Sequence, residues 1–188
     1  TPSAAGHASG GLAIFVKLSP NISLIKALPG CAHYQICLLK VDSGQYVICI
    51  NFYNNILAPN YDLVMGNLST DLEHLVTING IDPLIIWCGD FNIYPCYRPS
   101  PDLCGVLDEQ LEPQLHFSYT QLGAILNKLL TKFRLRFANE VSSPPLPFFY
   151  TFHSRGSKSS IDHVLVSTHF SSRDFSFLCP VLPFSDHL

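Results

Sequence analysis

Residues 84–92 read Leu-Ile-Ile-Trp-Cys-Gly-Asp-Phe-Asn, a short apolar run that ends directly in a polar turn. A continuous apolar run of this length, bounded by turn-forming residues, is typical of a strand buried on both faces. Polar side chains at the end of such a strand leave the sheet and can converge on a site. We therefore predict a buried strand over 84–88, with candidate site residues directly after it at Asp90 and Asn92.

The flanking sequence alternates between strand and helix patterns. Periodicity and turn residues predict the following elements: a strand over 12–16, a hairpin over 34–41 and 45–53 with its turn at 42–44, helices over 62–76 and 120–133, loops over 93–116 and 153–160, and strands over 161–166 and 174–182. Internal repeats and a separating linker are absent from the sequence. The pattern predicts one domain over residues 1–188, an α/β sandwich of two sheets with helices packed outside.

Composition narrows the class of protein. Of 188 residues, 47% are hydrophobic and only 13% are charged, which favours a globular fold over disorder. The apolar runs are too short to cross a bilayer, and we expect no membrane partner. The formal net charge is −3, whereas proteins that grip nucleic acid over a broad surface are normally basic. A phosphate group would therefore be bound locally, by a metal or a few cations.

Seven cysteines form no C-x-x-C pair. Their odd number and spacing match neither a disulfide framework nor a zinc site. We interpret Cys37, Cys49 and Cys88, which lie in apolar runs, as small buried hydrophobes in a reducing compartment. Cys96 and Cys104 lie in a proline-rich loop and could pair if oxidised.

Three short polar clusters stand at expected strand ends. In the first, Asp90 could take a proton from water while Asn92 orients that water or a phosphate oxygen; an Asx turn that closes the strand is the alternative. In the second, Asp162 would be costly to bury without a cation, a metal or a histidine; the alternative is a satisfied strand-entry aspartate. His163 should lie on the opposite face, in a structural role.

The third cluster is Ser185-Asp186-His187. A carboxylate and an imidazole side by side can serve one phosphate, with the imidazole oriented by a second carboxylate. An ordinary Asp-His pair at a strand entry is the alternative, because the dipeptide alone is weak evidence.

The order of these clusters along the chain carries more information than any one of them. Gly-Asp-Phe-Asn at 89–92, Tyr-Thr-Phe at 150–152, Ser-Ser-Ile-Asp-His at 159–163 and Ser-Asp-His at 185–187 together resemble the endonuclease/exonuclease/phosphatase superfamily. The chain is most similar to the endonuclease domain of non-LTR (LINE-type) retrotransposons. That resemblance implies a DNase I-like, four-layer α/β/β/α sandwich of two mixed sheets, and hydrolysis of phosphodiesters that depends on Mg²⁺ (or Mn²⁺).

The resemblance also implies roles for individual residues. Asp90 and Asn92 would position or activate the attacking water. His187, held by Asp162, would bind the scissile phosphate, and Asp186 would lie at the metal or assist the leaving oxygen. Tyr53 matches a tyrosine that contacts phosphate, although Asn-Asn follows it at 54–55 where the family usually has Ala-Pro; a buried strand-end tyrosine is the alternative.

A further set of residues matches positions that contact DNA near the cut, or lies in the same turn: Thr151, Ser159, Ile161, Arg155 and Lys158. For Ile161 a core role is the equal alternative. For Arg155 and Lys158 the alternative is a pair of solvated loop charges.

The family's metal-binding glutamate precedes a strand that begins with Gly-Gly, which Gly10-Gly11 match here, yet residues 1–9 contain no Glu or Gln. We therefore expect a partial domain that lacks the first strands and is truncated at both ends. The leading hypothesis is an endonuclease that nicks DNA, part of a polyprotein with reverse transcriptase, intracellular and nuclear when it acts. The alternatives are a phosphatase or phosphodiesterase of the same superfamily, and a catalytically impaired remnant that only binds DNA or protein.

Overall fold

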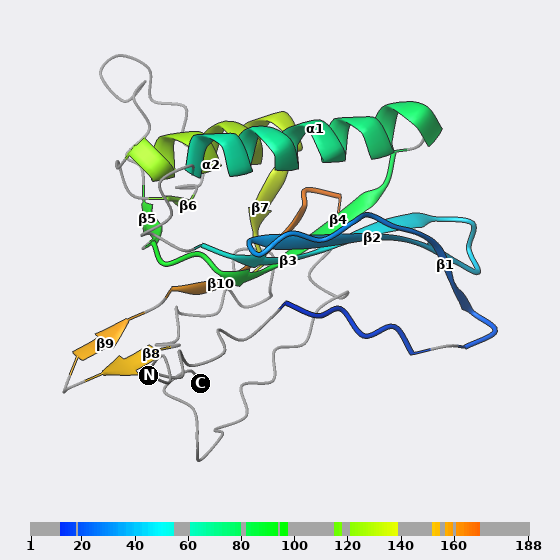
Figure 1. Ribbon diagram of the computed structural model, residues 1–188, viewed down its shortest axis with the longest axis horizontal. Helices are drawn as coiled ribbons and strands as arrows, with labels where there is room; N and C mark the ends of the chain where they lie inside the picture. Colours follow the sequence, from blue (N-terminus) through cyan, green and yellow to red (C-terminus); the bar gives the residue numbers. More distant parts are fainter. Residues whose placement is uncertain are drawn as a thin grey trace, which may run out of the picture.

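A mixed sheet of six strands forms the centre of the molecule (Figure 1). The computed structural model describes residues 12–17, 19–54, 61–79, 82–93, 95–97, 115–117, 121–138, 152–154, 157–159 and 161–169. Within these residues the strand order is β1-β2-β3-β4-β10-β7, and only the β3–β4 pair is parallel. The predicted α/β class is confirmed.

Strands β2 (Tyr34–Val41) and β3 (Tyr46–Tyr53) form the predicted hairpin. Gly44 closes its turn with a φ of 81°, a left-handed conformation that glycine adopts without a steric cost. The sequence patterns did not predict β1 (Ile22–Ala27), which pairs with β2 at the edge of the sheet and exposes five of its six residues.

Helix α1 (Tyr61–Asn79) connects β3 to the parallel strand β4 (Leu84–Asp90). It contains the predicted apolar stripe, of which Leu68, Leu72 and Leu75 are buried against the sheet. Parallel neighbours require such a crossover, because a tight turn cannot join them. Both predictions, helix and strand, are confirmed; β4 is buried on the helix side and half-buried on the other.

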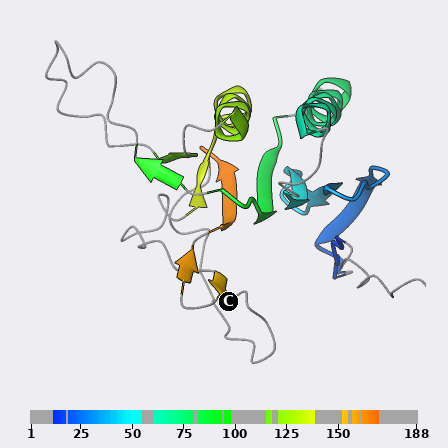
Figure 2. The same ribbon diagram turned by 60° about the vertical axis from the view of Figure 1, so that its left-hand side comes forward.

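Helix α2 (Gln121–Lys132) lies beside α1 on the same face of the sheet, as Figures 1 and 2 both show. A tight connection through Arg134, at φ 50°, leads into β7 (Leu135–Phe137). Strand β7 pairs with β10 (Asp162–Ser167), which in turn pairs with β4. The predicted helix over 120–133 and strand over 161–166 are therefore confirmed to within two residues at each end, whereas β7 was not predicted.

The core fills the space between the two helices and the sheet. Its largest fully buried side chains are aromatic, and Phe52, Trp87 and Phe91 contact one another with ring centroids 5.0–5.5 Å apart. Tyr34, which is also buried, donates a hydrogen bond of 2.9 Å to Asp71 of α1 and so links β2 to the helix layer.

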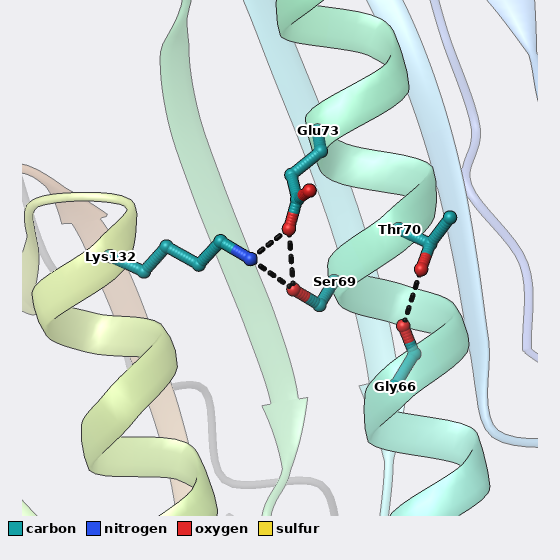
Figure 3. Close-up of polar contacts among 5 residues, drawn as sticks. All are labelled: Gly66, Ser69, Thr70, Glu73 and Lys132. Carbon is teal, nitrogen blue, oxygen red and sulfur yellow. Dashed lines mark hydrogen bonds and ion pairs between the residues drawn. The ribbon is translucent and has the colours of Figure 1, made fainter.

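A polar cluster bridges the facing sides of the two helices (Figure 3). Lys132 of α2 forms an ion pair with Glu73 of α1 and donates a hydrogen bond of 3.0 Å to Ser69. Both charged side chains are about half exposed. On the side of α1 away from Lys132, Thr70 donates a hydrogen bond to the Gly66 carbonyl within the helix.

Two small antiparallel ribbons correct the predicted loops. Strands β5 (Pro95–Tyr97) and β6 (Leu115–Phe117) pair within the region predicted as one long loop. Strands β8 (Phe152–Ser154) and β9 (Ser157–Ser159) pair where a polar turn was predicted, on the side of the sheet away from the helices (Figure 1).

The predicted strand over 12–16 is wrong: residues 12–17 run beneath the sheet without entering a strand. Asn51 of β3 donates a hydrogen bond of 3.0 Å to the Ala13 carbonyl in this segment. The predicted strand over 174–182 lies outside the described residues. Neither helix in the described part of the chain is long and apolar enough to cross a membrane.

Candidate active site

Three of the predicted site residues meet at one edge of the sheet. Strands β3 and β4 are parallel and end at Tyr53 and Asp90, while the antiparallel β10 begins at Asp162. In the strand register Tyr53 pairs with Asp90, and Asp90 pairs with Asp162. Side chains of directly paired residues point to the same face. The sheet therefore brings a phenol and two carboxylates into one row.

This row lies on the face turned away from the helices. On the helix side, Ile50, Trp87 and Leu165 are paired in register and are 0–2% exposed. Because side chains alternate between faces along a strand, the row of Tyr53, Asp90 and Asp162 lies on the other side. The two aspartates are partly exposed and Tyr53 is 40% exposed. The alternative of a buried strand-end tyrosine is wrong.

Gly89 allows β3 and β4 to approach closely just before the site. A Cβ atom at this position would lie 1.9 Å from the Phe52 carbonyl oxygen and 2.7 Å from the Phe52 carbonyl carbon. The contact is with backbone, which cannot move aside as a flexible side chain could. The glycine of the Gly-Asp-Phe-Asn motif therefore has a packing reason in this fold.

The Asp90 carboxylate is held by Asn92. The Asn92 backbone N–H donates to Oδ1 at 2.9 Å, and Asn92 Nδ2 donates to Oδ2 at 3.2 Å. Strand β4 ends at Asp90 and does not continue to residue 92. Instead Asn92 takes a φ of 48° and folds back onto the carboxylate. The Asx turn is therefore present, and it orients the carboxylate that the catalytic interpretation requires.

Asn92 also donates from Nδ2 to the Asn54 carbonyl at 2.8 Å. With this bond and the bond to Asp90, both N–H groups of the Asn92 amide are used, and among the described residues its acceptor Oδ1 is left for another partner. Such an amide can accept a hydrogen bond from water. The geometry thus favours the predicted role of orienting water over that of donating to a phosphate oxygen.

Asn54 is the site residue that sequence reasoning missed. It follows Tyr53, is 1% exposed, and donates from Nδ2 to the Phe91 carbonyl at 2.6 Å. Its backbone N–H donates to the Asp90 carbonyl at 2.8 Å. The signal in the sequence is the Asn-Asn pair at 54–55, which departs from the family's usual Ala-Pro.

Ile161 and His163 flank Asp162 and belong to the core. Ile161 is 7% exposed, and its carbonyl accepts a hydrogen bond of 2.8 Å from the Phe91 N–H. The His163 ring contacts Phe91 and Phe137, and its Nε2 lies 3.0 Å from the Ile93 carbonyl oxygen. Burial lowers the pKa of His163 to about 4. The imidazole is therefore neutral at physiological pH, and the structural role predicted for it is confirmed.

The remaining predicted site residues lie wholly or partly outside the described residues. Thr151, Arg155, Asp186 and His187 lie outside the described residues. Ser159 and Lys158 belong to β9 by their backbone, but their side chains are also outside the description.

The cysteines that the structure describes are free thiols, and the predicted burial is confirmed for Cys37. Cys37 is buried, Cys49 and Cys88 are half-buried, and Cys31 is exposed. Cys37 and Cys49 are paired in register on β2 and β3. A hydrogen bond from the Cys49 thiol lowers the pKa of Cys37 to about 7, whereas the same contact raises the pKa of Cys49.

Two carboxylates at paired positions on one face are suitable donors for a hard divalent cation, which prefers oxygen ligands. Within the described residues no group of three or more His, Cys, Asp or Glu side chains could hold a metal by itself. The carboxylates of Asp90 and Asp162 are therefore chemically suited to bind a metal ion, but only together with further ligands.

Comparison with known proteins gives a family match over nearly the whole chain. A family described as "Endonuclease/Exonuclease/phosphatase family" matches residues 1–187. A comparison with curated proteins found no match.

Similar solved structures include truncated TDP2 of Caenorhabditis elegans (14% identity, TM-score 0.44), the human Nocturnin catalytic domain with bound sulfate (13%, 0.46) and ANGEL2, a 2',3'-cyclic phosphatase (14%, 0.41). They cover 80%, 81% and 80% of this chain, which spans 54%, 50% and 56% of theirs. The chain thus spans about half the length of these proteins. At such identities and TM-scores, the likeness carries no argument about substrate or mechanism.

Proposed function

Because the chain belongs to the endonuclease/exonuclease/phosphatase family, we propose that it is a metal-dependent phosphodiesterase that nicks DNA, of the kind found in retrotransposon polyproteins. The observation that carries the proposal is the register of three strand ends, in which Tyr53, Asp90 and Asp162 stand side by side on one face. The sequence motifs predicted these residues separately, and the fold brings them together.

Asp90 is the group that orients or deprotonates the attacking water. Its two oxygens accept hydrogen bonds from Asn92, which fix the orientation of the carboxylate. The Asn92 Oδ1 acceptor can hold a hydrogen of the same water. A carboxylate positioned in this way meets the geometric requirement of a general base, which is the first criterion for such a residue.

Tyr53 and Asp162 act on the phosphate side of the reaction. The partly exposed phenol of Tyr53 can donate a hydrogen bond to a phosphoryl oxygen. Asp162 would orient His187, whose imidazolium would neutralise the scissile phosphate. A divalent cation held by Asp186, with Asp90 and Asp162 nearby, would offset negative charge on the phosphoryl and leaving oxygens.

The proposed partner is DNA, and the proposed context is a polyprotein with reverse transcriptase that acts in the nucleus. A net charge of −3 supports local capture of one phosphate by metal and imidazole rather than a broad basic surface.

A nicking assay tests the proposal. Supercoiled plasmid is incubated with the chain in Mg²⁺ or in EDTA, and the open-circular form is quantified. We expect Mg²⁺-dependent nicking that falls at least about 100-fold in Asp90→Asn and Asp162→Asn. Asp42→Asn is the matched control, because Asp42 is an exposed carboxylate at the turn of the β2–β3 hairpin, at the opposite end of the sheet.

Nicking that persists unchanged in Asp90→Asn would contradict the proposed site. If the chain instead releases inorganic phosphate from small phosphomonoesters and leaves the plasmid intact, the phosphatase alternative replaces the endonuclease. If it binds DNA without cleaving any phosphoester, it is the binding remnant.

A further inference from the structure

Asn54 lies at the junction between the end of β3 and the Asp90–Asn92 turn. Its backbone N–H donates to the Asp90 carbonyl at 2.8 Å, its carbonyl accepts from Asn92 Nδ2 at 2.8 Å, and its own Nδ2 donates to the Phe91 carbonyl at 2.6 Å. One residue therefore contacts all three members of the turn. Two of these contacts use its backbone, and the third depends on the carboxamide side chain.

Burial of the Asn54 carboxamide has an energetic cost. The side chain is 1% exposed, and its Oδ1 is buried with no hydrogen-bond partner among the described residues. An unsatisfied buried acceptor costs about 1–3 kcal/mol, a cost that an apolar side chain of similar size would avoid. Stability alone therefore gives a weak reason for an asparagine here. The short bond from Nδ2 to the Phe91 carbonyl is what the carboxamide adds.

With the bond from Asn54 Nδ2, the ring, the N–H group and the carbonyl group of Phe91 all have a contact. The Phe91 ring packs against Phe52 and Trp87 in the core, and its N–H donates to the Ile161 carbonyl at 2.8 Å. The bond from Asn54 fixes the remaining carbonyl, whose peptide leads directly into Asn92. The orientation of this peptide sets the direction of the Asn92 side chain, which in turn holds the Asp90 carboxylate.

We infer that Asn54 is a positioning residue: its carboxamide, through the Phe91 carbonyl, keeps Asn92 and Asp90 in the geometry that orients the attacking water. This inference rests on the proposed phosphodiesterase function for its catalytic consequence. Its structural part, that the carboxamide holds the turn, stands on the described contacts. A displacement of about 1 Å at a reacting group can cost about 100-fold in rate.

The test replaces Asn54 with aspartate, which keeps the shape of the side chain but, when ionised, cannot donate to the Phe91 carbonyl. Burial beside a carbonyl raises the pKa of such a carboxyl above its ordinary value. At low pH the protonated Asn54→Asp side chain regains a donor, and at high pH it loses it. Asn21→Asp is the matched control, because Asn21 is exposed and its carbonyl accepts a hydrogen bond from Asp42 N–H at the β2–β3 turn, at the opposite end of the sheet.

Hydrolysis of bis(p-nitrophenyl) phosphate in Mg²⁺ is measured from pH 5 to 9 for the three proteins, with the folded fraction monitored. For Asn54→Asp we expect a kcat about 10- to 100-fold below wild type at high pH, with KM within about twofold, and partial recovery of the kcat ratio as the pH falls. Asn21→Asp should follow the wild-type profile. A kcat ratio near one at every pH, or a loss confined to KM, would overturn the inference.

Amide hydrogen exchange separates this inference from the proposed function. In Asn54→Asp at high pH, the Asn92 amide should exchange at least about tenfold faster, while the amides of Ile50 and Leu165 in the central strands stay protected. If wild type hydrolyses no phosphodiester, the proposed function fails, and the exchange result alone decides the positioning role. Unchanged exchange at Asn92 would then overturn it.

Discussion

A set of three Gly→Ala substitutions tests how tightly β3 and β4 pack at the candidate site. At Gly89 the new Cβ would lie 1.9 Å from the Phe52 carbonyl oxygen, with a φ of 156°. Overpacking costs about 1–3 kcal/mol and backbone strain a further 1–3 kcal/mol, so we expect Gly89→Ala to lose about 2–6 kcal/mol. This is a large part of the stability of an ordinary domain.

The other two glycines are internal controls. Gly44 has a φ of 81° but nothing within 4 Å, so Gly44→Ala should cost only the left-handed conformation, about 1–2 kcal/mol. Gly66 lies within α1 with open space around it, so Gly66→Ala should stabilise the protein by about 0.4–1 kcal/mol. The expected order of stability is therefore Gly66→Ala, wild type, Gly44→Ala, Gly89→Ala.

Urea unfolding measured by tryptophan fluorescence provides the free energies. Trp87 is the single tryptophan of the chain and is 0% exposed, so its emission reports loss of the core between helices and sheet. A loss for Gly89→Ala that equals or falls below the loss for Gly44→Ala would refute the close approach of the two strands. It would also remove the packing explanation for the glycine of the Gly-Asp-Phe-Asn motif.

Three further predictions concern groups outside the turn. Burial lowers the pKa of His163 to about 4 from 6.5. The neutral imidazole therefore contributes fully to the free energy of unfolding above pH 6.5, and this contribution is lost as the pH falls towards 4. Urea unfolding at a series of pH values should show the loss, about 3 kcal/mol, in wild type and not in His163→Gln. Lys132→Ala should lower the free energy of unfolding by less than about 1 kcal/mol, because its ion pair with Glu73 is half exposed. A double-mutant cycle with Glu73→Ala should give a coupling energy that salt reduces. A coupling energy above about 2 kcal/mol would contradict the half-exposed geometry. Tyr34→Phe should lower the free energy of unfolding by about 1–3 kcal/mol through loss of the bond to Asp71, and an equal loss in an Asp71→Ala background, which has no acceptor, would show that the bond is not responsible.

The elements with a strong period or a long apolar run were predictable from sequence. Leu68, Leu72 and Leu75 follow one helical face, and residues 84–88 have no polar interruption. Strand β1 has neither signal, because it lies at the sheet edge and exposes Leu24 and Ile25 by about half each. Residues 12–16 show the opposite case: they are β-prone, yet a strand requires a partner, and sequence does not state which segments pair.

The candidate site shows the same division. Asp90 and Asp162 were predictable as site residues because a carboxylate next to a buried strand is costly to bury without a partner. Their adjacency was not, since it depends on the parallel β3–β4 register and the antiparallel β4–β10 register. The role of Asn54 depends on three bonds to residues 36–38 positions further along the chain. No local pattern reports contacts of that kind.

The claim that Tyr53, Asp90 and Asp162 form one phosphodiesterase site is tested most directly by paramagnetic metal binding. Mn²⁺ is titrated into ¹⁵N-labelled protein, and the broadening of each backbone amide signal is followed by NMR. We predict that the amides of Tyr53, Asp90 and Asp162 broaden first and together, before those of the exposed carboxylates Asp42 and Asp62, and that Asp90→Asn weakens the effect. Broadening that begins at Asp42 or Asp62, or that leaves the three strand ends unaffected, would contradict the account.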